Sequence, residues 1–393
     1  MRKAVPLAAL MGALLLLYAS GALAQPQTPA QKIPHRYLVV FKDGVRSPAE
    51  LADEHARTNG LGLRFVYTSA IEGYAASFPN DQALQRVEND PRVAYVEQDQ
   101  VVRAEGQVLP WGIDRIDADI SSTKAGDGLG KISNVNAYII DTGVDASHTD
   151  LHVVKQVNFR GDGKNYDCNG HGTHVAGTVV ATDNAQDVVG VAPGAPITAV
   201  KVLGCDGTGS SSSVIAGVDW VTQHAAKPAI ANMSLGGGAS QAMDDALRKS
   251  AKSGVFYSIA AMNNGANACN YSPARTGRTK KADGTWNNDN GIMTVAATNK
   301  QDEETSWSNF GPCVDIWAPG DLILSTRNGG GTTTMSGTSM AAPHIGGGGA
   351  LYLSRNTGAS PSAVEKALEG AAVRPGTKSK DGRSILLEYV GGF

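Results

Sequence analysis

The sequence has little net charge and few aromatic residues. Its 34 lysine and arginine residues nearly balance 37 aspartate and glutamate residues, so the formal net charge is -3, and aromatic residues make up 6% of the chain. We therefore expect neither nucleic acid nor an anionic membrane surface as the main partner. Charged residues make up 18% and hydrophobic residues 41% of the 393 residues, which excludes a disordered or fibrous chain. The length predicts two or three folding units.

Signals for metal-dependent catalysis are also absent. The chain has four cysteines and no two form a CxxC pair, which argues against a zinc ribbon or a thioredoxin-like site. His171 and His174 lie three residues apart, but the glutamate of an HExxH motif is missing and no third ligand is evident. We therefore expect no cofactor for catalysis. The alternative to catalysis without a cofactor is a metalloprotease, which chelators would inhibit rapidly.

Long apolar runs are missing except at the N-terminus. An apolar run at 4–18 lies between two basic residues and a small-residue cleavage pattern, which predicts a signal peptide over residues 1–24. A membrane anchor is the alternative, but the run is barely long enough to span a bilayer. Residues 25–35, with several prolines and glutamines, are expected to form a linker. The sequence thus predicts a secreted protein with no stable membrane anchor.

Residues 36–103 predict a small α+β unit. Strand signals at 36–42, 63–67, 73–78 and 93–97, with helix starts near residues 47 and 80, give the order β-α-β-β-α-β. The unit contains no cysteine and no cluster suited to catalysis, and a unit of this size is marginally stable alone. Its role is therefore expected to depend on the unit that follows.

Residues 104–393 predict a larger α/β unit. Glycine is abundant, with 47 residues in the chain and no G-X-Y period, which indicates many tight turns and close backbone approaches. Strand signals at 135–140, 197–203, 229–234, 255–260 and 292–296 alternate with helix signals at 174–182, 214–224 and 242–253. This alternation predicts a parallel sheet with helices on both faces and a ligand site beyond the carboxyl ends of the strands.

Three motifs in the larger unit carry side chains suited to nucleophilic catalysis. Asp141 ends a buried strand before Thr-Gly, a signal that is weak alone and more typical of a turn. His171 lies between glycines at the start of a helix. Ser339 begins a helix after a Gly-Thr loop, where the amide dipoles favour a developing anion. A serine hydroxyl becomes a useful nucleophile only beside a base such as histidine.

The order of these residues and the strings around them resemble the subtilisin-like serine proteases. The likeness is strongest to the proteinase K-like branch and its aqualysin-type enzymes, and includes Asn-Met-Ser-Leu-Gly-Gly-Gly at 232–238 and Asn-Tyr-Ser-Pro-Ala at 270–274. It implies a mostly parallel α/β sheet with helices on both faces, preceded by an inhibitory propeptide. We therefore expect a monomeric, secreted serine endopeptidase that is made as a self-processed zymogen, is inhibited by its own propeptide and cleaves proteins and peptides.

The resemblance also implies roles for individual residues. Asp141, His171 and Ser339 would form the catalytic triad, and the Ser339 backbone N–H and the Asn263 amide would bind the oxyanion. Asn263 could instead be a turn residue, because Asn-Asn-Gly is typical of turns. The residues expected to contact substrate are Ser234, Leu235, Gly236, Gly207, Thr208, Gly209, Ala260, Ala261 and Met262.

Two departures from the family pattern bear on activity. Met262 stands where relatives usually have glycine, so its thioether could fill the primary specificity pocket and favour small side chains, or could turn into the core. Glycines occupy positions 346–349 of the helix expected after Ser339. Three more glycines than the family usually has there cost about 3 kcal/mol of helix stability relative to alanine. A subtilase scaffold that has lost its chemistry through these changes is the rival hypothesis.

The cysteines and one acidic residue predict cross-links and a metal site. In an exported protein, four cysteines predict two disulfides with three possible connectivities. The resemblance favours the pairs Cys168 with Cys205 and Cys269 with Cys313. It also implies a structural calcium ion bound by Asp315 and by carbonyls near Asn290 and Ile292, although a charged loop cap would explain the aspartate equally well.

Overall fold

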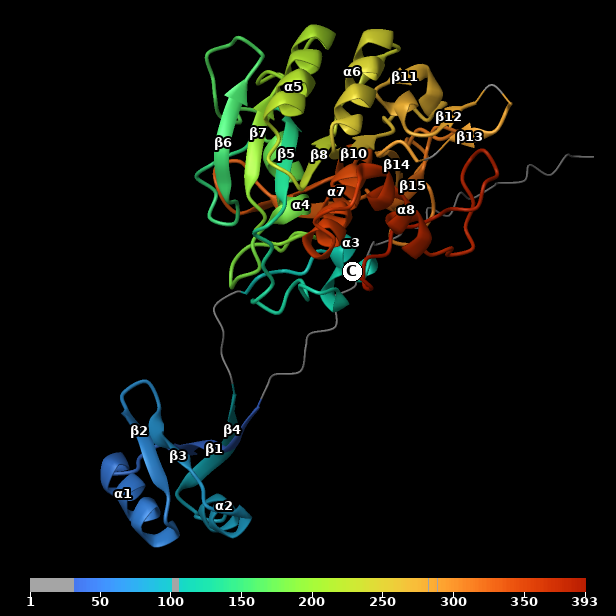
Figure 1. Ribbon diagram of the computed structural model, residues 1–393. Coiled ribbons are helices and arrows are strands. Elements are labelled where there is room, and N and C mark those ends of the chain that lie inside the picture. Colours follow the sequence, from blue (N-terminus) through green and yellow to red (C-terminus); the bar gives the residue numbers. More distant parts are fainter. Residues whose placement is uncertain (1–31, 101–105, 282, 288) are drawn as a thin grey trace, which may run out of the picture. The chain divides into compact units, whose positions relative to one another are not determined.

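The computed structural model describes residues 32–100, 106–281, 283–287 and 289–393. Their contacts divide them into two compact units, one before and one after residues 101–105 (Figure 1). The predicted signal peptide at 1–24 and the first part of the predicted linker lie outside the described residues. The first strand begins at Lys32, so the folded part of the first unit starts four residues before position 36.

The first unit is a four-stranded antiparallel sheet with two helices. Its elements are β1 (Lys32–Phe41), α1 (Pro48–Asn59), β2 (Gly62–Thr68), β3 (Glu72–Ser77), α2 (Asp81–Glu88) and β4 (Val93–Gln100). The strands lie in the order β2-β3-β1-β4, and the predicted succession β-α-β-β-α-β is confirmed. Val39 of β1 and Tyr74 of β3 pack against Leu51 of α1 in the core of the unit.

The second unit is built around a seven-stranded parallel sheet in the order β15-β14-β10-β8-β5-β7-β6. The sheet strands are β5 (Asn136–Asp141), β6 (Val153–Asn158), β7 (Ile197–Lys201), β8 (Ala229–Met233), β10 (Val255–Ala260), β14 (Ile292–Thr298) and β15 (Ile316–Pro319). The helices are α3 (Trp111–Arg115), α4 (His171–Val180), α5 (Ser211–His224), α6 (Gln241–Lys252), α7 (Thr338–Arg355) and α8 (Pro361–Ala371). Short pairs complete the unit: β9 (Gly237–Gly238) with β11 (Tyr271–Ser272), β12 (Thr279–Lys280) with β13 (Trp286–Asn287), and β16 (Ile323–Thr326) with β17 (Thr332–Met335).

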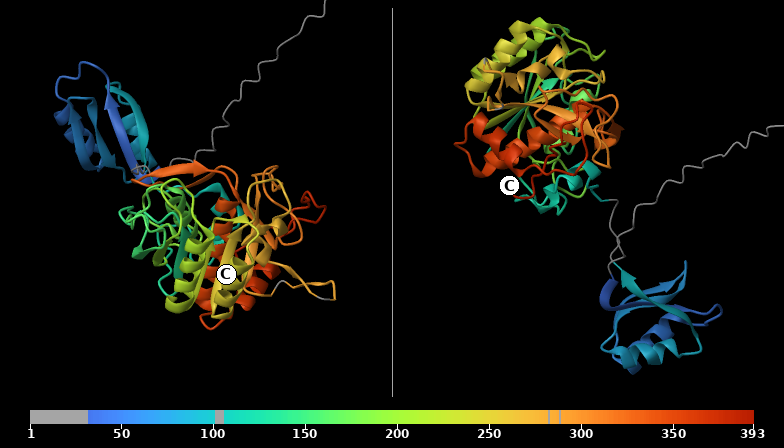
Figure 2. Two further views of the ribbon diagram at one scale, coloured as in Figure 1. Left: turned by 90° about the horizontal axis from the view of Figure 1, so that it is seen from above. Right: turned by 90° about the vertical axis from the view of Figure 1, so that its right-hand side faces the viewer.

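Helices cover both faces of this sheet, as the alternating sequence predicts (Figure 2). Successive residues of a strand point to opposite faces, and β5 shows this directly. Ile139 packs into the core that includes α4, α7 and α8, whereas Ile140 packs into the core that includes α5 and α6. The predicted α/β fold with a mostly parallel sheet is therefore confirmed.

Helix α7 is continuous from Thr338 to Arg355, and the four glycines at 346–349 are all buried within it. A Cβ at Gly347 would collide with Val191, and one at Gly349 would collide with the ring of Phe256. The glycines thus allow α7 to approach its neighbours closely. The burial of this helix compensates for its low intrinsic propensity.

Candidate active site

The three predicted catalytic residues lie at the ends of elements of the second unit. Asp141 is the last residue of β5, His171 is the first residue of α4, and Ser339 is the second residue of α7. Gly170 precedes α4 with φ 102°, a left-handed conformation that suits glycine and lets the chain turn directly into the helix. Residues separated by almost 200 positions in the sequence are thereby brought to one edge of the sheet.

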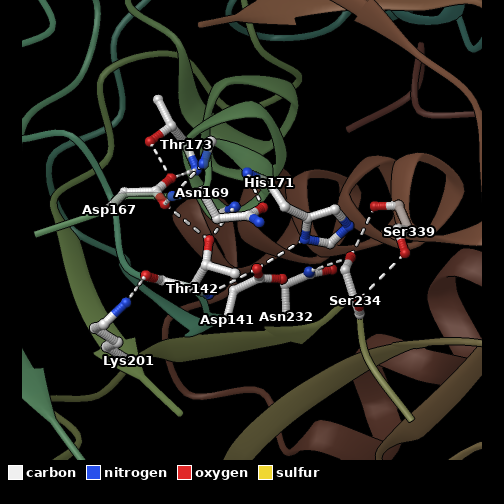
Figure 3. A network of polar contacts seen from close by, with 12 residues as sticks. Asp141, Thr142, Asp167, Asn169, His171, Thr173, Lys201, Asn232, Ser234 and Ser339 are labelled. Atoms are coloured by element: carbon white, nitrogen blue, oxygen red, sulfur yellow. Dashed lines mark hydrogen bonds and ion pairs between the residues drawn. The ribbon is translucent and has the colours of Figure 1, made fainter. Parts of the chain in front are cut away.

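Asp141 and His171 form a direct pair (Figure 3). The Nδ1 atom of His171 lies 2.7 Å from Oδ1 of Asp141, and the Thr142 backbone N–H donates to the same oxygen. Asp141 is fully buried, whereas the side chain of His171 is 26% exposed. Burial alone would lower the pKa of His171, but the charge and hydrogen bond of Asp141 outweigh burial and leave that pKa above its ordinary value.

Ser339 faces the same cleft as His171. In Figure 3 the imidazole ring lies between the Asp141 carboxylate and the Ser339 side chain. Among the described residues, the Ser339 hydroxyl donates to the carbonyl oxygen of Ser234 at 3.1 Å and not to the imidazole. His171 and Ser339 both line a cleft of about 410 Å³. In ligand-free sites such catalytic hydrogen bonds are commonly long and tighten when substrate binds.

Asp167 fixes the segment that leads into His171. Its carboxylate accepts hydrogen bonds from the hydroxyls of Thr142 and Thr173 and from the backbone N–H groups of Asn169, Gly170 and Thr173. These five bonds join the end of β5 to the start of α4. The sequence analysis missed this residue, although its position four residues before His171 was an available signal.

Asn263 is held with its amide nitrogen free for a ligand. Its Oδ1 accepts hydrogen bonds from the backbone N–H and the hydroxyl of Thr338, each at 2.9 Å. The residue lines the cleft next to Ser339. Because the oxygen is engaged, the NH₂ group is the part of the side chain that remains to meet a developing oxyanion.

Met262 lines the cleft beside Asn263 in a left-handed conformation with φ 80°. Its backbone N–H donates to Thr338, and its carbonyl accepts from Asn309. Its sulfur lies 2.6 Å from the place that a Cβ on Gly236 would occupy. Its sulfur therefore lies beside Gly236, which also lines the cleft.

The two expected substrate-binding edges both line the cleft. They are the segment Ser234, Leu235 and Gly236 and the segment Gly207, Thr208 and Gly209. Ala260 and Ala261 differ from the expectation: they are 1% and 0% exposed and pack into the core. The reason is that Ala260 ends the buried strand β10, so only the residues beyond Ala261 reach the cleft.

Both disulfides favoured by the resemblance are present, which confirms the pairing. Cys168 and Cys205 join the segment before His171 to the loop that precedes Gly207. Asn169 reinforces this link, because its side-chain amide donates to the Cys205 carbonyl. Cys269 and Cys313 join a short 3-10 helix that follows β10 to the segment before β15.

An acidic cluster contains Asp315, the side chain expected to bind calcium, together with two carboxylates that were not expected, Glu365 and Glu369. Single carboxylate oxygens of Asp315, Glu365 and Glu369 all lie within 4.8 Å of one another. Oδ1 of Asp315 and Oε1 of Glu365 are buried without a hydrogen-bond partner among the described residues. Burial raises the pKa of Asp315 well above its ordinary value, and burial with the charge of Asp315 raises the pKa of Glu365 to about 10.

The expected carbonyl segment lies next to this cluster. The Glu365 carboxylate accepts a hydrogen bond from the N–H of Gly291, between Asn290 and Ile292. The Asn290 side chain is engaged locally, donating to carbonyls at 276 and 277 and accepting from the N–H of Ile292. The sequence analysis missed Glu365 and Glu369, although their i, i+4 spacing places them on one face of a helix.

Comparisons with known proteins agree with this geometry. Residues 134–391 match the subtilase family, and residues 36–105 match the peptidase inhibitor I9 family. The chain belongs to the subtilase family. It is 43% identical to an extracellular serine proteinase of Thermus sp. (strain Rt41A) over 370 residues, which cover 86% of this chain and 85% of that relative.

Two further similarities point the same way. Alkaline serine exoprotease A of Vibrio alginolyticus is 41% identical over 85% of this chain, which covers 63% of that protein. A crystal structure of a cold adapted subtilisin-like serine proteinase is 40% identical and superposes with a TM-score of 0.62, covering 72% of this chain and 98% of that one. This subtilase is a secreted serine endopeptidase that carries its own inhibitory propeptide. No helix within the described residues is long and apolar enough to cross a membrane.

Proposed function

We propose that Asp141, His171 and Ser339 are the catalytic triad of this endopeptidase. The observation that carries the proposal is the 2.7 Å bond between His171 and a fully buried Asp141, in the same cleft as Ser339. This bond fixes the imidazole so that Nδ1 carries a proton and Nε2 is available as a base.

The reaction follows from these positions. Ser339 Oγ attacks the scissile carbonyl carbon while His171 Nε2 takes its proton, and the resulting oxyanion accepts hydrogen bonds from the Asn263 amide and the Ser339 backbone N–H. The protonated imidazole then donates that proton to the leaving amine as the C–N bond breaks. Water then attacks the acyl carbon while His171 Nε2 takes its proton. The imidazolium returns that proton to Ser339 Oγ as the acyl bond breaks, which releases the carboxylic acid and free Ser339.

The substrate is proposed to bind as an extended strand between the segments 234–236 and 207–209, which both line the cleft. Met262 narrows the pocket beside Gly236 and favours small P1 side chains. The enzyme is proposed to act as a monomer on proteins and peptides.

The zymogen is proposed to consist of a signal peptide at 1–24, a linker at 25–35, a propeptide at 36–103 and a catalytic domain at 104–393. The propeptide would inhibit the catalytic domain until the chain is cut between residues 102 and 107. The mature N-terminal sequence tests this division, because a start near residue 104 that disappears in Ser339→Ala shows processing and activity together.

Calcium is proposed to bind at Asp315, Glu365 and Glu369 in a structural role. The residues fit such an ion: Asp315 and Glu365 each have a buried oxygen without a hydrogen-bond partner among the described residues, and hard oxygen ligands suit calcium. Backbone carbonyls of Asn290 and Ile292 are the further ligands that the resemblance implies. Bound calcium would neutralise charge that burial otherwise disfavours.

The test of the catalytic proposal is hydrolysis of casein and a chromogenic peptide by processed protein, with and without phenylmethylsulfonyl fluoride, beside Ser339→Ala. We expect turnover that the serine reagent and the substitution both abolish. Absence of inhibitor-sensitive turnover in processed protein would instead favour the rival hypothesis of an inactive scaffold. Rapid loss with chelators and indifference to the serine reagent would indicate a metalloprotease.

A further inference from the structure

A chain of buried hydrogen bonds runs from the sheet to Ser339. The Ser258 hydroxyl of β10 donates to Oδ1 of Asn232 on β8 at 2.9 Å, and Nδ2 of Asn232 contacts the Ser234 hydroxyl at 2.9 Å. The Ser234 hydroxyl in turn donates to the backbone carbonyl of Ser339 at 2.7 Å. Ser258 and Asn232 are fully buried and Ser234 is 3% exposed, so water does not substitute for these bonds.

The direction of every bond in this chain is fixed. The Ser339 carbonyl can only accept, so the Ser234 hydroxyl must donate to it and must accept from the Asn232 amide nitrogen. The amide oxygen of Asn232 therefore faces Ser258, which must donate. Removing the Ser258 hydroxyl leaves that buried oxygen without the bond that sets the amide orientation.

Ser234 holds Ser339 at two points. Its hydroxyl donates to the Ser339 carbonyl, and its own carbonyl accepts the Ser339 hydroxyl at 3.1 Å (Figure 3). A change in the position of Ser234 is therefore transmitted both to the reacting hydroxyl and to the first turn of α7, where the backbone N–H proposed for the oxyanion lies.

The space that Ser258 occupies depends on a glycine of the run in α7. A Cβ at Gly346 would lie 2.9 Å from the Ser258 hydroxyl oxygen, which is closer than real Cβ contacts allow. Its next neighbours, a methyl group of Ile230 and the amide oxygen of Asn232, would lie at ordinary contact distances of 3.7 and 3.8 Å. Of the three nearest atoms, only the Ser258 hydroxyl oxygen would have to move to admit a side chain at position 346.

We infer that Ser258 is a positioning residue for the nucleophile, which acts through Asn232 and Ser234, and that Gly346 makes room for its hydroxyl. This inference rests on the proposed role of Ser339. It assigns a function to a serine that contacts neither substrate nor the triad, and it connects one glycine of α7 directly to catalysis.

The test is a double-mutant cycle on processed enzyme with Ser258→Ala, Gly346→Ala and the combined variant. For Ser258→Ala we expect kcat to fall about tenfold because the nucleophile is displaced by a fraction of an ångström, with KM and the acid limb of the pH profile unchanged. Gly346→Ala should lower kcat similarly in the wild type, because the new methyl group displaces the Ser258 hydroxyl. In the Ser258→Ala background the same substitution should cost little further activity.

A matched control separates positioning from general stability. Ser250 is also fully buried, and its hydroxyl bonds to Tyr257 of the same strand β10, away from Asn232. Ser250→Ala should lower the Tm as Ser258→Ala does and leave kcat at the wild-type value. All rates are compared at a temperature where circular dichroism shows each variant folded.

The outcomes are distinguishable from failure of the proposed function. If Ser339→Ala retains turnover, the catalytic assignment itself is wrong. If Ser339→Ala is inactive but Ser258→Ala keeps the wild-type kcat, only the positioning inference is overturned. The inference is also overturned if Gly346→Ala lowers kcat by the same factor in both backgrounds, because the two sites are then independent.

Discussion

Buried carboxylates near the rim of the cleft and in the C-terminal part of the catalytic unit differ in what surrounds them. Close to the rim, Asp167 accepts five hydrogen bonds, and Asp141 has one oxygen bonded to His171 and the other without a partner among the described residues. Near α8, Asp315 and Glu365 each leave an oxygen without a partner, and both oxygens of Glu388 are unpartnered among the described residues. Hydrogen-bond donors satisfy Asp167 and the imidazole lies beside Asp141, whereas the unpartnered oxygens near α8 require a proton or a cation.

The largest effect is expected at the rim, from Asp141→Asn. The amide cannot stabilise the imidazolium or select the same tautomer, so kcat should fall by about 10⁴-fold. His171 must be neutral to accept a proton, so activity falls as the pH drops through its raised pKa. The substitution removes the interaction that raises this pKa and should move the acid limb to lower pH. A pH–rate profile of both proteins checks this, and an unmoved limb would contradict our account.

The second-largest effect is expected from calcium removal at the cluster of Asp315, Glu365 and Glu369, which tests whether a cation binds the oxygens that have no partner among the described residues. In Ser339→Ala protein, which cannot digest itself, removal of calcium should lower stability by about 3 kcal/mol if the ion had been present at a hundredfold excess over its Kd. Differential scanning calorimetry with calcium and with EDTA measures the loss. Glu365→Gln should reduce the difference in Tm between calcium and EDTA. Equal Tm values with calcium and EDTA would contradict a structural site.

A smaller effect on stability is expected from substitution of Glu388. Burial raises the pKa of this carboxyl well above its ordinary value. The folded protein keeps this carboxyl protonated while the unfolded chain releases the proton near pH 4.3. The unfolded state therefore binds fewer protons, and stability falls as the pH rises above that value until the folded pKa is reached. Glu388→Leu should remove this decline and raise stability by about 1–3 kcal/mol at alkaline pH.

Glu304 provides the matched control for Glu388. Its side chain is 1% exposed but accepts hydrogen bonds from Trp317, Ser379 and Lys380. Glu304→Leu should destabilise the protein because it leaves those donors unpaired. Tm values between pH 5 and 10 in the Ser339→Ala background compare the two variants. If both substitutions change the Tm in the same direction, the contrast between partnered and unpartnered carboxylates fails.

The alternation of strand and helix signals was enough to predict the α/β fold, and the resemblance to the subtilisin-like family was enough to predict the disulfide pairs. Asp141, His171 and Ser339 could be proposed as a triad because their order and the strings around them resemble that family, although the Asp-Thr-Gly signal is weak alone. Contacts between distant segments could not be found in this way. Ser258 and Gly346 meet only after β10 and α7 have packed together, and no local pattern marks either residue.

The errors have similar physical causes. The resemblance placed Ala260 and Ala261 among the substrate contacts, but their side chains lie at and directly after the end of a buried strand and pack into the core. The carboxylates that accompany Asp315 come from α8, some 50 residues further along the chain. Their helical spacing could have suggested a shared face, but only the folded chain brings that face to Asp315.

The smallest effect is expected from a substitution of Met262, a non-glycine residue with a left-handed backbone conformation at the rim of the cleft. Met262→Gly should open the pocket beside Gly236 and raise kcat/KM for large P1 side chains about tenfold relative to alanine at P1. Glycine also adopts φ 80° without strain, so stability should not fall. A P1 series of chromogenic peptides measures the change, with Ala at P1 as the internal reference. If wild type and variant cleave large and small P1 residues in the same ratio, the thioether does not shape the pocket, and the rim's selectivity must come from the backbone edges alone.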